Sequence, residues 1–153
     1  MEAVQTWRRR LILGTANGLN NQALLLQAQG ELAAARPLFE RALEIRERVL
    51  GPDHPDTATS LNNLAWLLQV HGELAAARPL FERALAIRER VLGPDHPDTA
   101  TSLNHLGWLL QAQGELAAAR PLFERALAIS ERVLGPDHPD TALIRSNLAA
   151  LRA

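Results

Sequence analysis

Residues 51–58 read GPDHPDTA, and the same eight residues return at 93–100 and again at 135–142, a spacing of 42 residues. When residues 31–72 are set over residues 73–114, only five positions differ, among them Asn63 against His105. Repetition at a period of 20–50 residues is typical of solenoids, in which each unit buries its apolar face against its neighbours. The sequence therefore predicts an array of repeats.

Helix-breaking residues divide each unit into two predicted helices. Gly72 separates the first helix from the second, and Gly93 ends the second as a left-handed residue. The following helix opens either with Pro97 in its first turn or with Asp98 as its N-cap. The expected helices of this unit cover about 56–71 and 74–92.

The apolar residues of these helices indicate how they stack. At 100° per residue, Leu61, Leu64 and Leu68 form one stripe that faces the partner helix. The second helix carries two apolar stripes, one containing Phe81 and one containing Ile87, so it needs two neighbours. Helix formers dominate the composition and Tyr is absent. We predict an all-α fold, a right-handed superhelical solenoid of antiparallel helix pairs.

Charge and composition favour some classes of protein over others. The chain has 16 basic and 17 acidic residues, whereas nucleic-acid binders usually carry a basic excess, so we expect no nucleic-acid partner. No apolar run is long enough to cross a bilayer, and the N-terminus lacks the apolar core of a signal peptide. We therefore expect no membrane partner and a cytoplasmic location.

The repeated loop Asp53-His54-Pro55-Asp56 contains residue types that bind metals. Beside two prolines in a tight loop, these side chains cannot all converge on one ion, so loop structure and helix capping explain the motif better. The chain has no Cys, no Gly-rich phosphate loop and neither a GxSxG nor an HExxH motif. We predict no enzyme, and hence no catalytic residue, no metal site and no cofactor.

The pattern resembles the tetratricopeptide repeat, and the 42-residue unit is similar to the kinesin-light-chain subclass of that family. The signature spacing is carried by Leu61, Leu64, Ala65, Gly72, Ala77, Phe81 and Ala84. The chain departs from the family in using Leu68 and Leu74 where Tyr is common. Repeats this alike suggest either a recently expanded bacterial array or a consensus design.

The ends of the chain differ from the middle. Residues 1–13 lack the PDHP breaker and carry an amphipathic stripe, which predicts an N-terminal capping helix or arm. The array then covers 14–153, with repeat units at about 14–55, 56–97 and 98–139 and a C-terminal capping helix at 140–153. Arg145 and Arg152 replace core Leu residues in that last helix, and polar substitution is how a solenoid ends.

The resemblance implies that the first helix of each pair lines the concave groove, where a polar and aromatic stripe is expected to bind peptide. Asn and Gln pair with both donors and acceptors of a peptide backbone, and Trp is enriched at binding hot spots. The alternative is that the Trp residues only fill space between helices. The predicted peptide-binding residues are Asn17, Asn20, Leu24, Gln27, Thr59, Asn62, Trp66, Gln69, Thr101, Asn104, Trp108 and Gln111.

Two functional classes follow from these features. The first is a protein–protein interaction scaffold that binds a peptide or protein segment of unknown identity in the groove. The second is a self-association module, in which terminal repeats or the N-terminal helix pack against another copy to give a homo-oligomer. A consensus-like scaffold without a dedicated ligand is a further alternative.

Overall fold

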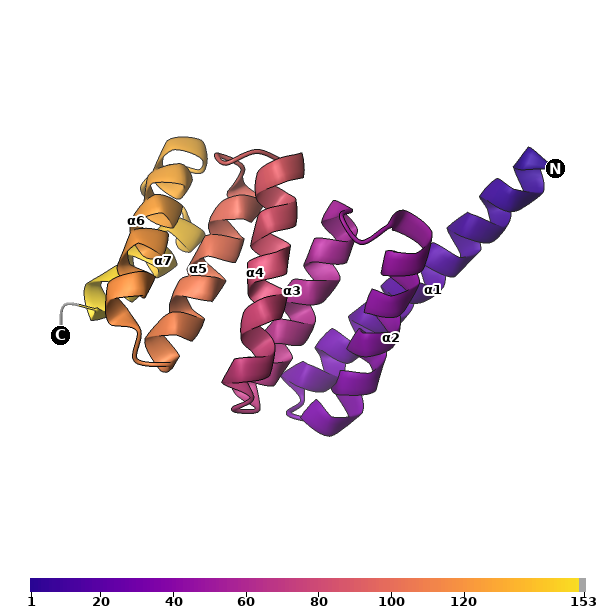
Figure 1. Ribbon diagram of the computed structural model, residues 1–153, viewed down its shortest axis with the longest axis horizontal. Coiled ribbons are helices and arrows are strands. Elements are labelled where there is room, and N and C mark those ends of the chain that lie inside the picture. The colour runs from indigo at the N-terminus through magenta and orange to yellow at the C-terminus, as the bar shows by residue number, and fades with distance from the viewer. Residues whose placement is uncertain (152–153) are drawn as a thin grey trace.

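The computed structural model describes residues 1–151, and over this range the chain forms seven α-helices and no strand. The helices are α1 (Glu2–Ala28), α2 (Leu32–Leu50), α3 (Pro55–Val70), α4 (Leu74–Val91), α5 (Pro97–Ala112), α6 (Leu116–Val133) and α7 (Pro139–Ala150). Three pairs, α1 with α2, α3 with α4 and α5 with α6, stack in chain order, and α7 packs against α6 (Figure 1). The predicted all-α solenoid of helix pairs is confirmed.

The repeated loops end and start helices in the same way each time. Gly72 and Gly93 have φ angles of 85° and 97°, a conformation that residues with a Cβ rarely adopt. His96 is the N-cap of α5, because its Nδ1 accepts a hydrogen bond from the Asp98 main-chain N–H at 3.1 Å. Pro97 is the first helical residue, so the alternative expectation of Asp98 as the N-cap is wrong. His54 and His138 cap α3 and α7 in the same manner.

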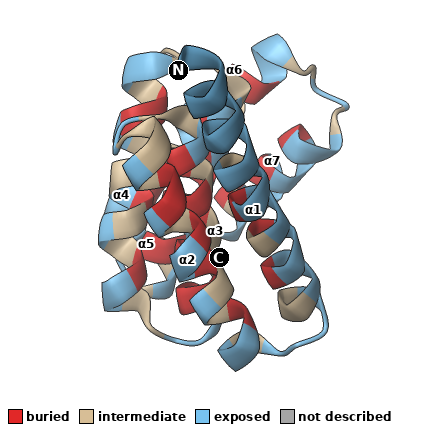
Figure 2. Cartoon of the chain, turned by 90° about the vertical axis from the view of Figure 1, so that its right-hand side faces the viewer, coloured by how far each residue is buried: buried red, intermediate tan, exposed pale blue. Residues whose placement is uncertain are grey.

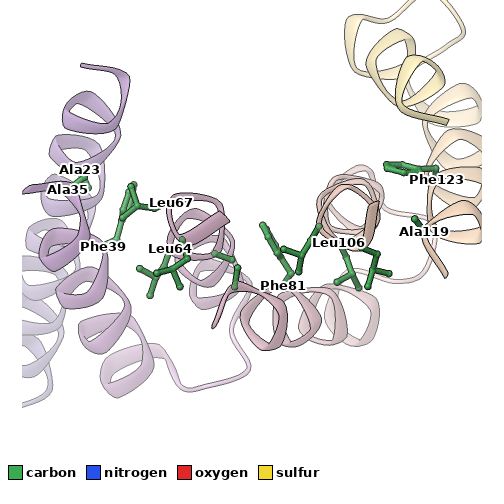
Figure 3. Close-up of a cluster of buried hydrophobic side chains, with 14 of the residues drawn as sticks. Ala23, Ala35, Phe39, Leu64, Leu67, Phe81, Leu106, Ala119 and Phe123 are labelled. Carbon is green, nitrogen blue, oxygen red and sulfur yellow. The ribbon is translucent and has the colours of Figure 1, made fainter. Parts of the chain in front are cut away.

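One hydrophobic core runs through the stacked repeats (Figure 3). The phenylalanines Phe39, Phe81 and Phe123 are fully buried at the same position of α2, α4 and α6. Each packs with apolar side chains from neighbouring helices, such as Leu64 and Leu106. Burying a side chain of this size contributes about 1.5–3 kcal/mol, so this core stabilises both the helix pairs and the stacking of one pair on the next.

Buried arginines join each of the first two pairs to the helix that follows it. Arg88 of α4 is 6% exposed, and its Nη1 donates to Ser102 Oγ at 2.8 Å and to the Asp98 main-chain carbonyl at 3.2 Å. Its Nη2 donates to Thr59 Oγ1 of the preceding helix at 3.3 Å. Arg46 occupies the equivalent position in α2, bonded to Ser60 and to Asn17. We call this arrangement the arginine clasp.

The outer surface of α2, α4 and α6 carries ion pairs between repeats. Arg36 pairs with Glu40 on its own helix and with Glu73 of the next repeat, both at 2.9 Å. Arg78 repeats this arrangement with Glu82 and Glu115. Exposed pairs of this kind contribute only about 0–1 kcal/mol each, so they add to the stacking without determining it.

The two ends of the described chain are unlike the middle. α1 runs without a break across residue 13, and its first turns extend beyond α2 with every residue from 2 to 12 exposed (Figures 1 and 2). In α7, Arg145 is exposed and pairs with Glu131 at 2.9 Å. Arg152 lies outside the described residues. The predicted division into an arm at 1–13 and an array at 14–153 remains a prediction.

Candidate functional site

The candidate site lies along the face formed by α1, α3, α5 and α7, which we call the A-helix face. The predicted stripe is not uniformly accessible there. Leu24 and Trp108 are 42% and 37% exposed, whereas the three carboxamides Asn20, Asn62 and Asn104 are about 7% exposed or less. The apolar and aromatic members of the stripe are therefore better placed to meet a partner than its asparagines.

The buried asparagines form a ladder between neighbouring A helices. Asn63 Nδ2 donates to Asn20 Oδ1 at 2.9 Å, and Asn147 Nδ2 donates to Asn104 Oδ1 at 3.0 Å. Asn62 Nδ2 lies 2.7 Å from His105 Nδ1, in the equivalent contact between α3 and α5. Each contact joins residues 43 positions apart, one more than the repeat. These amides hold the A helices together.

Three further polar side chains of the stripe also serve the fold. Asn17 Oδ1 accepts from Arg46 at 2.7 Å, and Thr59 Oγ1 accepts from Arg88, so both belong to an arginine clasp. Thr101 Oγ1 donates to the Pro97 carbonyl of its own helix at 3.2 Å. These intramolecular hydrogen bonds explain the positions of all three side chains, and no ligand is needed to account for them.

Two tryptophans of the stripe stack on one another. The rings of Trp66 and Trp108 lie 4.8 Å apart with an interplanar angle of 20°, and His105 lies 5.4 Å from Trp66. Trp66 is partly buried and packs against the hydrophobic core, while Trp108 is more exposed. Stacked pairs contribute about 0.5–1.5 kcal/mol beyond their buried area. Trp66 therefore has a structural role, and Trp108 leaves more of its surface to solvent.

His105 is held neutral beneath the tryptophans. Burial and, to a smaller extent, the positive charge of Arg88 together lower its pKa from 6.5 to about 4. Its Nδ1 contacts Asn62, and its ring lies 5.8 Å from Phe81. At neutral pH this face therefore gains no charge from the histidine.

The three glutamines of the stripe behave differently from the asparagines. The Oε1 atoms of Gln27, Gln69 and Gln111 are buried and have no hydrogen-bond partner among the described residues, and the same is true of Asn62 Oδ1. A buried acceptor without a partner costs about 1–3 kcal/mol. Rotation about the last torsion exchanges the oxygen and the nitrogen, so each glutamine can present a donor or an acceptor.

The A-helix face is hollowed on either side of Trp66. A recess of about 450 Å³ between α1 and α3 is lined by Leu24, Gln27 and Trp66 among others. On the other side, two adjoining hollows of about 170 and 150 Å³ share Asn104, His105 and Leu143. We call these two the α5–α7 recess. Its remaining lining residues are Trp66, Trp108 and Asn147 in the first hollow and Thr101, Asp140 and Ile144 in the second.

The stripe predicted from the sequence omitted several residues of this face. His105, Asn147 and Leu143 line the α5–α7 recess although none was among the predicted residues. His105 was signalled by the sequence, because it is one of the five positions at which the two central repeats differ. Leu143 and Asn147 lie on the terminal helix, which was treated only as a cap.

Comparison with known proteins agrees with this architecture. The model of the tetratricopeptide repeat family matches residues 14–89, 69–132 and 109–153. The chain therefore belongs to the tetratricopeptide repeat family, whose fold generally serves as a protein–protein interaction scaffold and is typically non-catalytic. No curated protein sequence matches it significantly.

Solved structures place the chain more narrowly. It superposes on BtubC (BKLC) from P. vanneervenii with a TM-score of 0.81 and 27% identity, covering 89% of this chain and 54% of that one. A putative kinesin light chain from Podosopora anserina with nearly identical TPR-like repeats gives 0.82 and 28%, covering 88% and 64%. The chain thus spans about half to two thirds of these proteins. Its repeats are of the kinesin-light-chain-like subclass.

A more distant structure shows the fold alone. The N-terminal domain of stress-induced protein-1 from C. elegans superposes with a TM-score of 0.65 at 17% identity, over 93% of this chain and 98% of that domain. Within residues 1–151, none of the helices has the length and apolar character required to traverse a membrane.

Proposed function

We propose that the A-helix face binds an extended segment of a partner protein, with Trp108 as its main apolar contact. The observation that carries this proposal is the pair of recesses that flank the stacked tryptophans. Partly exposed Trp residues give large contact area with little loss of rotamer entropy on binding. The apolar surface beside them, including Leu24 and Leu143, suits partner side chains.

The glutamine column supports the same proposal. Gln27, Gln69 and Gln111 repeat along the face at the 42-residue period, and each has a carboxamide oxygen without a partner among the described residues. A peptide backbone repeats donors and acceptors along its length and can meet such a column when the amides turn outward. The asparagine ladder then acts as the rigid support of the site rather than as its contact surface.

The test separates binding from stability by using two tryptophans in different settings. Trp108→Ala should weaken binding of a selected peptide by more than about 1 kcal/mol, the level that defines a substantial interface contribution. It should lower the free energy of unfolding by roughly 0.5–1.5 kcal/mol, the contribution of a stacked aromatic pair. Trp7→Ala is the matched control, because Trp7 is exposed on α1 far from the recesses along the chain. Equal binding by both variants would rule the site out.

Self-association is the second candidate, and the exposed start of α1 favours it. Val4, Trp7 and Leu11 are 54%, 63% and 59% exposed and recur at helical spacing on one side of the helix. Apolar side chains gathered in this way are usually covered by a partner. Sedimentation of the full chain against Trp7→Ser tests this: a concentration-dependent dimer lost in the variant supports it, and a strict monomer at high concentration excludes it.

A further inference from the structure

The α5–α7 recess differs from the equivalent places in the earlier repeats by one missing positive charge. Arg46 and Arg88 each interact electrostatically with a carboxylate at the start of the next helix, Asp56 and Asp98 respectively. The residue in the same register after Arg88 is Ser130, whose Oγ lies 2.7 Å from Thr141 Oγ1 instead.

A second substitution accompanies the first. The hydroxyls that accept from the clasp arginines belong to Ser60 and Ser102, and the third position of this series is Ile144. Both halves of the clasp are therefore replaced together at the α6–α7 boundary. Asp140 follows Asp56 and Asp98 in the series, but at position 130, where the earlier repeats have the clasp arginine, the chain has Ser.

Within residues 1–151, Asp140 is the one carboxylate that lines the α5–α7 recess. Its side chain is 68% exposed, and the basic group nearest to it is His138, with Nδ1 at 3.8 Å. That nitrogen accepts the Asp140 main-chain N–H, so it does not donate a hydrogen bond to the carboxylate. The carboxylate is thus free to pair with a cation brought by a partner.

We propose that the α5–α7 recess holds a long basic side chain of the bound partner, an arginine, with its stem against Trp108 and Leu143 and its guanidinium at Asp140. This inference rests on the proposed function of the A-helix face. A guanidinium is a donor-only group that matches a carboxylate in two-point contact and stacks favourably on Trp. Asn147 uses its Nδ2 in the ladder, and its Oδ1 is left as an acceptor between the two ends.

The dimensions of the recess favour a side chain over a small molecule. Each of its hollows, of about 170 and 150 Å³, is smaller than the roughly 300–1,000 Å³ that small-molecule sites occupy, and the two together only reach the lower end of that range. Along α5 the recess runs from Thr101 to Trp108, about 10 Å at the helical rise. A short cation cannot reach both ends, whereas a side chain with an apolar stem can.

The charges near the recess should attract a cation with moderate strength. His105 is neutral at pH 7, because its pKa is lowered to about 4, so it does not repel the ligand. Arg88 is the nearby positive charge, and the Asp98 carboxylate balances it. The N-terminal dipole of α7 offsets roughly half of the Asp140 charge. The remaining attraction should therefore discriminate between ligands by a small factor rather than by orders of magnitude.

The first experiment identifies peptides with the full chain as bait. Random dodecapeptides displayed on phage are selected against the wild-type protein, and the best sequences are synthesised with a fluorescent label. We expect Arg at one fixed position. If no peptide is selected, the proposed function fails and this inference with it. If peptides are selected without a basic residue, the inference is overturned while the proposed function stands.

The second experiment is a thermodynamic cycle on the best peptide. Affinities are measured for wild type and Asp140→Asn, each with the Arg peptide and with the same peptide carrying neutral citrulline at that position. Asp140→Asn should lower the affinity for the Arg peptide about 3- to 10-fold and leave the affinity for the citrulline peptide unchanged. Equal losses for both peptides would show that the two groups do not meet and would overturn the inference.

Two further variants exclude a structural explanation. Asp56→Asn makes the same change at the same helix position in α3, away from the recess, and should leave the affinity for the Arg peptide within about twofold. The double variant Ser130→Arg with Ile144→Ser restores the clasp of the other two repeats. It should lower the affinity for the Arg peptide as Asp140→Asn does, since the new arginine at position 130 supplies the positive charge that the ligand would otherwise bring. Unchanged binding in the double variant would count against the proposal.

Discussion

α5 and α7 begin with the same residues after the same loop, and they end up in different surroundings. Leu103 of α5 is fully buried, whereas Arg145, at the same position of α7, is exposed. The difference arises because α5 packs against α6, which follows it, while α7 is the last helix of the described chain. Local sequence makes both helices, and the presence of a following helix decides which positions must be apolar.

The largest expected effect tests that difference directly. Leu103→Ala removes a buried side chain between α5 and α6 and should lower the free energy of unfolding by about 2–5 kcal/mol. Arg145→Ala removes an exposed ion pair and should change it by about 0.5 kcal/mol or less. Chemical denaturation of both variants measures the two values. Similar losses would mean that α7 has a packing partner after all.

A pH effect should distinguish position 105 from its equivalents. The unfolded chain binds a proton at His105 below about pH 6.5, while the folded chain does not until about pH 4. Stability should therefore fall as the pH drops through this interval, by up to about 3 kcal/mol from this group. His105→Asn, which places there the residue found at Asn63 and Asn147, should remove this component. Denaturation curves at pH 7, 5.5 and 4 measure this dependence for both proteins. If stability still falls with pH in His105→Asn, another group is responsible.

The capping histidines should contribute a smaller amount, equally at interior and terminal helices. His96→Ala removes the acceptor for the Asp98 N–H and should cost roughly 0.5–1 kcal/mol, the lower part of the range for N-caps. Neither zinc nor a chelator should change the melting temperature of the wild-type protein. A large rise with zinc would revive the metal-binding interpretation of these loops.

An effect of the opposite sign is expected at a position where α5 departs from α3. Gly107 stands where α3 has Ala65, and a Cβ there would lie 3.0 Å from Phe123. Since Ala65 fits against Phe81 in the preceding repeat, Phe123 should move aside. Gly107→Ala should then stabilise the protein by up to about 1 kcal/mol through helix propensity. A loss of stability would show that the last full repeat is packed more tightly than the one before it.

Much of the fold followed from the period and from the breakers. The expected helices at 56–71 and 74–92 correspond to α3 and α4 within about a residue at each end. The clasp did not follow from the sequence, because the Arg88 guanidinium binds the Asp98 main-chain carbonyl, and a main-chain acceptor leaves no signal in the residue types. The choice of His96 over Asp98 as N-cap was missed, since His is not a common cap.

The candidate site was less accessible to sequence reasoning. The sequence by itself determined the 42-residue period, the helix pairs and the side of each helix on which Trp66 and Trp108 lie, because these depend on local backbone preferences and on helical geometry. Only the tertiary structure decided that Asn20, Asn62 and Asn104 form hydrogen bonds between helices in a ladder. The same holds for the stacking of Trp66 on Trp108. The reason is that the contacts depend on how far one helix is displaced against the next. That displacement is set by the packing of whole repeats, and here it pairs residues 43 apart in a sequence that repeats every 42.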